Sequence, residues 1–216
     1  MSVASNGERP AKSGSVRNRE TQTVNSGTSA FILAGGHSSR MGADKALLSF
    51  GNRTLLERAL QTAATVAVKT CIVGPRGRYS EFGEVIEDIY RDCGPLAGIH
   101  AALSFTTTDL NLILSVDMPL MTPKFLSWLV AQAERSPELI VVPEAAGGLQ
   151  PLCATYRKAA CAFAKQSLQK GDYKVDHLFS QVPTRILKEK EIVANGFSPE
   201  IFRNVNTPEE YANCRP

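Results

Sequence analysis

Short, continuously apolar runs alternate with helical repeats along the chain from residue 29 onward. Uninterrupted apolar runs are typical of strands buried on both faces of a sheet. We expect such strands at residues 30–33, 71–73, 85–86, 112–116 and 139–142. Between them, apolar residues recur at helical spacing over residues 54–68, 96–105 and 123–134. Strands separated by helices predict an α/β fold with a mostly parallel central sheet and helices on both faces.

The alternation continues less regularly beyond residue 150. There the pattern predicts strands at residues 152–156 and 184–187, and helices at residues 158–168 and 208–212. In an open sheet of this kind, ligands bind beyond the carboxyl ends of the strands. Candidate functional residues are therefore those that directly follow a predicted strand.

The first 28 residues differ from the rest of the chain. They are polar, rich in Ser, Asn, Thr and Arg, and show no apolar periodicity, so they cannot bury enough surface to offset chain entropy. We expect a disordered extension at residues 1–28 and a single domain at residues 29–216. An organelle-targeting peptide is the alternative, which Glu8, Glu20 and the lack of an amphipathic pattern disfavour.

Charge and cysteine content exclude several classes of protein. Of the formal charge of +3, the extension carries +2, which leaves +1 for residues 29–216. A near-neutral domain lacks the positive charge that a nucleic-acid backbone requires. No apolar stretch is long enough to cross a membrane, and no secretory signal precedes the domain. The 5 scattered cysteines include no Cys-x-x-Cys pair, which disfavours a disulfide framework or a zinc site and indicates the reducing cytoplasm.

A glycine-rich segment with two cations follows the first predicted strand. Gly35 and Gly36 allow backbone N–H groups to approach an anion closely. Arg40 can grip phosphate oxygens in a two-pronged fork, and Lys45 supplies a compact positive charge. The spacing matches neither a P-loop nor the dinucleotide-binding Gly-x-Gly-x-x-Gly pattern. We interpret residues 35–45 as a phosphate-binding segment; a surface loop with incidental basic residues is the alternative.

Two carboxylates follow other predicted strands. Asp117 follows the most apolar one and is a natural Mg²⁺ ligand, because this ion binds one or two carboxylates and takes its other oxygens from phosphate and water. The alternative role, capping the next helix, is better filled by Thr122. Asp88 follows the strand at residues 85–86, where an ordinary surface charge is the alternative.

Two further pairs of residues are candidates for ligand contact. Gly94 and Gly98 bracket a helix start and permit a tight turn with close backbone approach to a ligand; a plain loop is the alternative. Asn204 and Asn206 would face the same side of a strand and could donate amide hydrogen bonds to a second substrate. Alternatively, one of them caps the helix predicted near Pro208.

The order of these segments resembles the molybdenum cofactor guanylyltransferases over residues 30–212. The segments that carry the resemblance are Leu33-Ala34-Gly35-Gly36, Arg40-Met41-Gly42, Asp44-Lys45, Glu87-Asp88, Gly94-Pro95-Leu96-Ala97-Gly98, Asp117-Met118-Pro119 and Asn204-Val205-Asn206-Thr207-Pro208. The resemblance implies a three-layer, Rossmann-like nucleotidyltransferase fold. It also implies transfer of GMP from GTP to the phosphate of molybdopterin or its molybdenum form, with Mg²⁺ as cofactor. Transient contact with cofactor-assembly and delivery proteins is a further expectation.

The resemblance also implies roles for the candidate residues. It gives catalytic roles to Arg40, Lys45 and Asp117, with Asp117 as the metal ligand. It places residues 29–120 mainly at the nucleotide and residues 121–216 mainly at the pterin, where Asn204 and Asn206 bind the second substrate. The nucleotide contacts that it implies fall on Leu33, Ala34, Gly35, Gly36, Lys45, Asp88, Gly94, Gly98 and Asp117.

One departure and three alternatives accompany this interpretation. Where the family can present an asparagine near the nucleotide, this chain has Val73-Gly74-Pro75-Arg76, so that contact is absent or replaced by Arg76. A cytidylyltransferase for the same pterin is disfavoured by Gly35-Gly36, because that branch resembles Leu-Ala-Ala-Gly. A sugar- or cobinamide-phosphate nucleotidyltransferase is disfavoured by the short interval from Arg40 to Lys45. A non-catalytic carrier of the finished cofactor would not need Arg40, Lys45 and Asp117.

Overall fold

The computed structural model of the chain describes Met1 and residues 25–35 and 44–205. Its centre is one sheet with the strand order β10-β7-β9-β6-β1-β4-β5, and β8 pairs with β7. The strands are β1 (Asn25–Leu33), β4 (Lys69–Val73), β5 (Val85–Ile86), β6 (Thr108–Ser115), β7 (Ile140–Ala145), β8 (Gly148–Leu149), β9 (Cys153–Arg157) and β10 (Thr184–Leu187). Every predicted strand is present, although β1 and β6 begin five and four residues earlier than the apolar pattern predicts.

The sheet is mostly parallel, as the sequence predicts. β1 pairs in parallel with β4 and β6, β4 with β5, and β10 with β7. Only β9, which lies between β6 and β7, and the short β8 run antiparallel to their neighbours. The sheet runs without a break from β10 to β5. Within it, β1 lies between β6 and β4, so these three strands are side by side.

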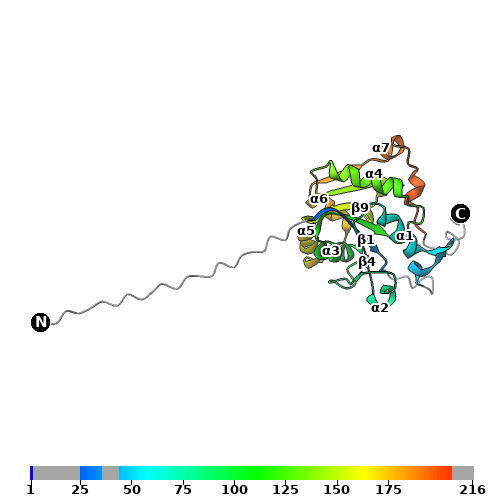
Figure 1. The fold of residues 1–216 in the computed structure, drawn as a ribbon. Helices are drawn as coiled ribbons and strands as arrows, with labels where there is room; N and C mark the ends of the chain where they lie inside the picture. The colour runs from blue at the N-terminus through cyan, green and yellow to red at the C-terminus, as the bar shows by residue number, and fades with distance from the viewer. Residues whose placement is uncertain (2–24, 36–43, 206–216) are drawn as a thin grey trace.

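Helices cover both faces of the sheet and make three layers (Figure 1). One face packs against α1 (Leu55–Ala64) and α4 (Pro123–Glu134), and the other against α3 (Pro95–Phe105), α5 (Ala160–Gln169) and α6 (Val175–Gln181). Successive residues of β1 alternate between these two cores: Ala30 and Ile32 face the first, whereas Phe31 and Leu33 face the second. This alternation explains why the central strands are apolar at every position.

The remaining elements are short. They are the hairpin β2 (Ser49–Phe50) and β3 (Arg53–Thr54), the helices α2 (Arg76–Tyr79) and α7 (Glu189–Ala194), and the 3-10 helices η1 (Lys45–Leu47) and η2 (Pro199–Phe202). Local capping fixes two of the longer helices where the sequence places them. Thr54 and Glu57 form a capping box at the start of α1, and the Thr122 hydroxyl caps α4. Residues 208–212, predicted as a closing helix, lie outside the described residues.

One predicted boundary is wrong. β1 begins at Asn25, so residues 25–28 belong to the sheet and not to the amino-terminal extension. These residues lack an apolar pattern because this end of β1 is stabilised by polar contacts. Thr28 and Ser29 are buried, and the Thr108 hydroxyl donates a 2.9 Å hydrogen bond to the Ser29 oxygen. Residues 2–24 lie outside the part of the chain that the structure describes.

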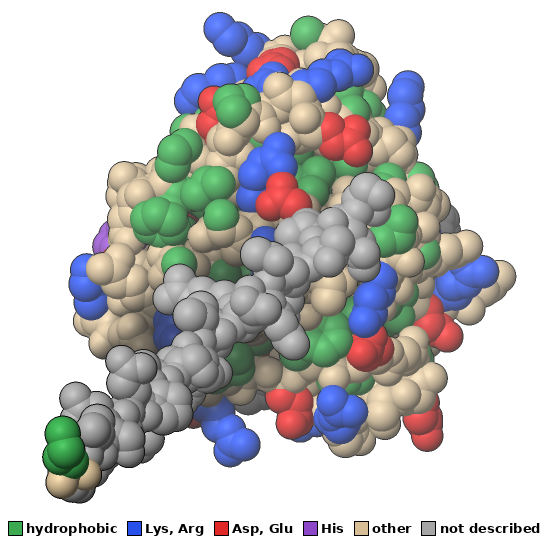
Figure 2. Space-filling view, turned by 60° about the vertical axis from the view of Figure 1, so that its left-hand side comes forward, with side chains coloured by type: hydrophobic (Ala, Val, Ile, Leu, Met, Phe, Trp, Pro, Cys, Tyr) green, Lys and Arg blue, Asp and Glu red, His purple; other side chains and the backbone are tan. Residues whose placement is uncertain are grey.

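The described surface carries charges of both signs. On the face shown in Figure 2, Lys and Arg side chains are interspersed with Asp and Glu, and no continuous basic stripe is visible. This distribution agrees with the near-neutral charge of the domain. Within the described residues, no helix is both long and apolar enough to cross a lipid bilayer.

Candidate active site

The candidate site lies at the carboxyl ends of β1, β4 and β6. Beyond β1 the chain stays bonded to both neighbouring strands: the Val116 N–H donates to the Leu33 carbonyl (3.2 Å), and the Ala34 and Gly35 N–H groups donate to the Val73 carbonyl (3.0 and 3.2 Å). Gly35 is exposed at this point. The described part of the phosphate-binding segment therefore starts at the middle of the sheet, where this fold binds its ligands.

The structure brings two of the predicted catalytic residues into direct contact. The Lys45 ammonium lies 3.1 Å from the Asp117 Oδ2 carboxylate oxygen. Lys45 begins η1, which returns the chain to the sheet after residues 36–43, and Asp117 follows β6 by two residues. Their side chains are 15% and 22% exposed, so a ligand can reach both. A cation and a carboxylate thus stand together at the edge where open sheets of this kind bind their ligands.

Asp44 caps the short helix that Lys45 begins. The Asp44 Oδ1 oxygen accepts a hydrogen bond from the Ala46 N–H (3.1 Å) and caps the first turn of η1. The Tyr79 hydroxyl contacts both Asp44 carboxylate oxygens at 2.9 Å, and the Arg78 guanidinium pairs with Oδ2 at 3.3 Å. Tyr79 is not a candidate from the sequence alone, because nothing near it in the chain signals a contact with Asp44.

Tyr79 is buried and neutral. Its hydroxyl also lies 3.1 Å from the Ala34 carbonyl, and only 1% of the residue is exposed. Burial, and after it the hydrogen bond to Asp44, raises the pKa of Tyr79 above its usual range. The hydroxyl is therefore a hydrogen-bond donor at neutral pH.

Two hydrogen bonds from other parts of the chain hold the turn after Asp117. The Arg58 side chain, from α1, donates to the Pro119 carbonyl, and the Val205 N–H donates to the Asp117 carbonyl at 3.0 Å. The second bond brings the carboxyl-terminal segment back to the site and places Asn204 beside it. Asn204 is exposed, in irregular structure and not in the strand that the alternation predicts. Asn206 lies outside the described residues.

Asp88 lies at the carboxyl end of β5. It is exposed at the surface, yet the protein around it partly desolvates the carboxylate and raises its pKa. Its neighbour Glu87 has a structural role, because a Glu87 carboxylate oxygen accepts a hydrogen bond from the Arg76 N–H at 3.1 Å. Asp88 is the carboxylate of this pair that stays open to a ligand, and its contact with the nucleotide remains a prediction.

The structure gives Gly94 and Gly98 different physical roles. Gly94 precedes α3 with φ of 66° and ψ of −163°, a conformation that is open almost only to glycine. Gly98 lies within α3, where an added Cβ would stand 3.2 Å from Leu33 Cδ2 and 3.5 Å from Val73 Cγ1. Its missing side chain lets α3 pack closely on β1 and β4. Contact of either glycine with the nucleotide remains a prediction.

The departure at residues 73–76 has a structural reason. A Cβ on Gly74 would lie 2.9 Å from Tyr79 Cε2 and 3.3 Å from the Gly35 nitrogen, so a side chain at this position would displace Tyr79. Arg76 does not extend toward a ligand in its place, because its guanidinium donates to the Val85 carbonyl at 2.9 Å. Gly36 and Arg40 lie outside the described residues.

The donor set fits a magnesium ion that is shared with a substrate. No group of three or more His, Cys, Asp or Glu among the described residues is arranged to hold a metal by itself. A dedicated protein site is therefore not built in this part of the chain. A single partly exposed carboxylate at Asp117 matches the way Mg²⁺ binds to proteins that supply one or two carboxylates and leave the rest to phosphate and water.

Comparisons with known proteins agree with this geometry. The family described as "MobA-like NTP transferase domain" matches residues 30–185. A probable molybdenum cofactor guanylyltransferase of Clostridium perfringens is 33% identical over 187 residues, which cover 85% of this chain and 93% of the relative. The molybdenum cofactor guanylyltransferase of Vibrio parahaemolyticus is 32% identical over 189 residues, covering 86% and 93% of the two chains.

Solved structures show the same fold. Molybdopterin-guanine dinucleotide biosynthesis protein A from Archaeoglobus fulgidus superposes with a TM-score of 0.74 over 86% of this chain and 95% of its own, at 22% identity. A nucleotidyl transferase from Methanothermobacter has a TM-score of 0.68 over 88% and 97%, at 17% identity.

Fold, site and relatives together define a nucleotidyltransferase enzyme. Within that class, the chain belongs to the MobA-like NTP transferase family of the molybdenum cofactor guanylyltransferases.

Proposed function

We propose that this chain transfers GMP from GTP to the terminal phosphate of molybdopterin or its molybdenum form. An oxygen of that phosphate bonds to the α-phosphorus of GTP, the bond between the α- and β-phosphates breaks, and pyrophosphate leaves. The observation that carries the proposal is the contact between Lys45 and Asp117 at the carboxyl edge of the sheet, in a chain whose relatives are named guanylyltransferases.

The chemistry needs positioning and charge neutralisation rather than a side-chain nucleophile. The attacking phosphate is already ionised at neutral pH, so no strong base is required. We assign Lys45 and Arg40 to the triphosphate, where their charges oppose the negative charge that develops on pyrophosphate. The backbone of residues 33–36 borders the nucleotide.

The metal assignment rests on Asp117. We assign this carboxylate as the protein ligand of Mg²⁺, which when bound supplies positive charge against the phosphate oxygens. Lys45 shares one oxygen of the same carboxylate, so the two positive charges would lie on the same side of the triphosphate. Asp117 thereby orients Lys45 as well as the ion.

The remaining assignments concern the two substrates. We assign Asp88, Gly94 and Gly98 to the nucleotide: Asp88 follows β5, Gly94 precedes α3, and Gly98 faces Leu33 and Val73 at the ends of β1 and β4. Asn204 and Asn206 are assigned to the pterin substrate, which the Val205–Asp117 hydrogen bond supports for Asn204 because it holds that segment beside the metal ligand.

The enzyme is proposed to work in the cytoplasm together with cofactor-assembly and delivery proteins. Cys71, Cys93, Cys153 and Cys161 are free thiols, which suits a reducing compartment. Burial raises the pKa of Cys71 to about 12 and that of Cys153 still further above its usual range, so neither of these two thiols is poised for chemistry.

The proposal is tested by incubating the full chain with Mg²⁺, GTP and molybdopterin. Pyrophosphate and the guanine dinucleotide form of the pterin should appear in equal amounts. Omitting molybdopterin should abolish both. Release of pyrophosphate or phosphate that does not depend on the pterin, or no release at all, would contradict the proposal.

A further inference from the structure

The Tyr79 hydroxyl connects the two described ends of the phosphate-binding segment. It lies 3.1 Å from the carbonyl of Ala34, just before residues 35–45, and 2.9 Å from both carboxylate oxygens of Asp44, at their end. These partners are 45 and 35 positions away from Tyr79 in the sequence. A phenol has one proton to donate, and the negative charge of Asp44 makes that carboxylate the stronger acceptor.

Asp44 links Tyr79 to the short helix that Lys45 begins. The carboxylate oxygen that contacts Tyr79 also accepts the Ala46 N–H at 3.1 Å and so caps η1. Lys45 is the first residue of that helix. The orientation of η1 therefore decides whether the Lys45 ammonium meets Asp117 at 3.1 Å. In a 3-10 helix of only three residues, a cap is a large part of what fixes the orientation.

The core fixes Tyr79 itself. The residue is 1% exposed and packs in the same hydrophobic cluster as β1 and α1. Its ring passes so close to Gly74 that a Cβ there would lie 2.9 Å from Tyr79 Cε2. A buried ring without free volume holds its hydroxyl at one place, so the Asp44 carboxylate is positioned by the rigid core and not by the surface.

We propose that Tyr79 is a positioning residue for nucleotidyl transfer, which acts through Asp44 to hold Lys45 against Asp117. This inference rests on the proposed function for the role of Lys45. Tyr79, on α2, would thus support the site without contacting a ligand itself.

The first test is kinetic and uses Tyr79→Phe, which removes only the hydroxyl. We expect kcat/KM for GTP to fall about tenfold to a hundredfold, the range that follows from misplacing a catalytic group by about 1 Å. In a Lys45→Ala background the same change should cause little further loss, because the group that Tyr79 positions is gone. If the fall in kcat/KM in the double variant equals the product of the falls in the two single variants, the proposal is overturned.

The matched control is Tyr156→Phe. Tyr156 is also fully buried and its hydroxyl also donates a hydrogen bond, in this case to the Pro151 carbonyl at 2.9 Å, but it packs in the opposite hydrophobic cluster. Both substitutions should lower the thermal stability to a similar extent, whereas only Tyr79→Phe should lower kcat/KM for GTP. An equal loss of kcat/KM in both variants would show that Tyr79 is merely structural.

The second test does not depend on activity. Hydrogen exchange should show the amide of Ala46, which donates to Asp44 Oδ1, exchanging several-fold faster in Tyr79→Phe and unchanged in Tyr156→Phe. Unchanged exchange at Ala46 overturns the positioning role. If the wild-type chain fails to transfer GMP while Ala46 responds, the proposed function is wrong and the link from Tyr79 through Asp44 to η1 stands.

Discussion

Lys45 and Asp117 are 72 positions apart in the sequence, yet their side chains form an ion pair of 3.1 Å. The contact exists because β1 and β6 are adjacent parallel strands whose carboxyl ends reach the same edge of the sheet. η1 and Asp44 then return Lys45 to this edge. The fold itself thus brings together the cation and the carboxylate that we assign to nucleotidyl transfer.

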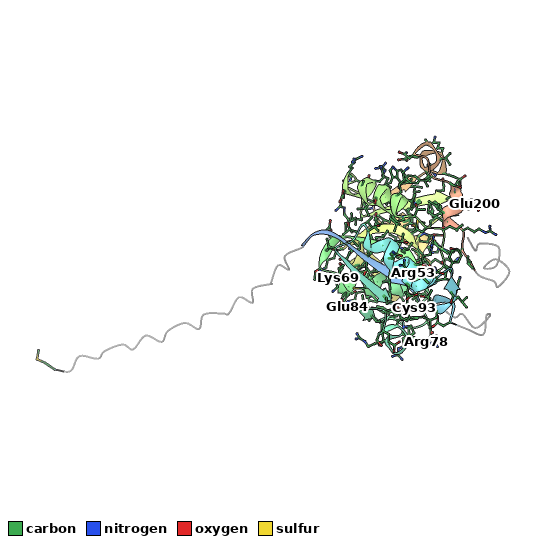
Figure 3. All side chains as sticks on the ribbon, turned by 45° about the vertical axis from the view of Figure 1, so that its right-hand side comes forward. Arg53, Lys69, Arg78, Glu84, Cys93 and Glu200 are labelled. Atoms are coloured by element: carbon green, nitrogen blue, oxygen red, sulfur yellow. The ribbon has the colours of Figure 1, made fainter. Side chains whose placement is uncertain are left out.

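Lys45→Ala should lower turnover about a hundredfold or more, because it removes a preorganised charge from the developing negative charge of the transition state. The measurement is pyrophosphate release at saturating GTP and pterin. Lys69→Ala is the matched control, since Lys69 forms a 2.7 Å ion pair with Glu84 (Figure 3) at the amino end of β4, whereas the candidate site lies at the carboxyl end of that strand. Full turnover in Lys45→Ala would remove Lys45 from the mechanism.

Chelation of divalent ions should stop turnover without unfolding the chain, because no cluster of metal-ligating side chains in the described residues would need the ion for stability. Asp117→Asn should raise the Mg²⁺ concentration needed for half-maximal turnover about tenfold or more, since the amide is a weaker ligand. The measurement is a Mg²⁺ titration of both proteins with a parallel melting curve. An unchanged Mg²⁺ requirement in the variant argues against Asp117 as the ligand.

Gly74→Ala should destabilise the chain by about 1–3 kcal/mol, because its Cβ would lie 2.9 Å from the Tyr79 ring in a filled core. It should also lower turnover, since Tyr79 must move. Gly77→Ala is the control: Gly77 lies on α2 with Tyr79, and a Cβ at this position would meet no atom within 4 Å. Urea denaturation of the two variants gives the comparison, and equal stabilities would contradict the packing argument.

His100 should make the fold less stable in mild acid. Burial, followed by the charge of Lys165, lowers the pKa of His100 below its ordinary value of 6.5. Its Nε2 lies 3.3 Å from the Ser104 hydroxyl, and Nδ1 has no hydrogen-bond partner within the described structure. The unfolded chain therefore binds more protons than the folded one as the pH falls below 6.5, and the free energy of unfolding decreases.

The test of the His100 prediction is the free energy of unfolding of the wild-type chain and of His100→Gln between about pH 7.5 and pH 5.5. Glutamine keeps a hydrogen-bonding group near Ser104 and does not titrate. The variant should lose less stability on acidification than the wild type. Parallel curves for the two proteins would show that His100 does not contribute.

The sheet was predictable from the sequence because its strands are buried on both faces. Continuous apolar runs marked β4, β6 and β7, and Thr122 with Pro123 marked the start of α4. The pattern cannot show strand direction, so the antiparallel β9 was not foreseen. The hairpin of β2 and β3 and the four-residue α2 are too short to carry a period.

The candidate residues could be chosen from the sequence only where their position after a predicted strand carries information. Asp117 and Asp88 each follow a strand by two residues, and Lys45 belongs to the glycine-rich segment after the first strand. Tyr79 had no such signal, because its partners are brought to it by the tertiary fold. The start of β1 was missed for a related reason: Thr28 and Ser29 are stabilised by buried hydrogen bonds and not by apolar packing.

The most direct test of the central proposal is nucleotide selectivity in pyrophosphate release. The full chain, with Mg²⁺ and molybdopterin, is given GTP, CTP or ATP in separate reactions, and kcat/KM is compared. The proposed guanylyltransferase activity predicts release with GTP at a rate at least tenfold above the other two. Release with CTP alone would make the enzyme a cytidylyltransferase, and release with none of the three would contradict nucleotidyl transfer to this pterin altogether.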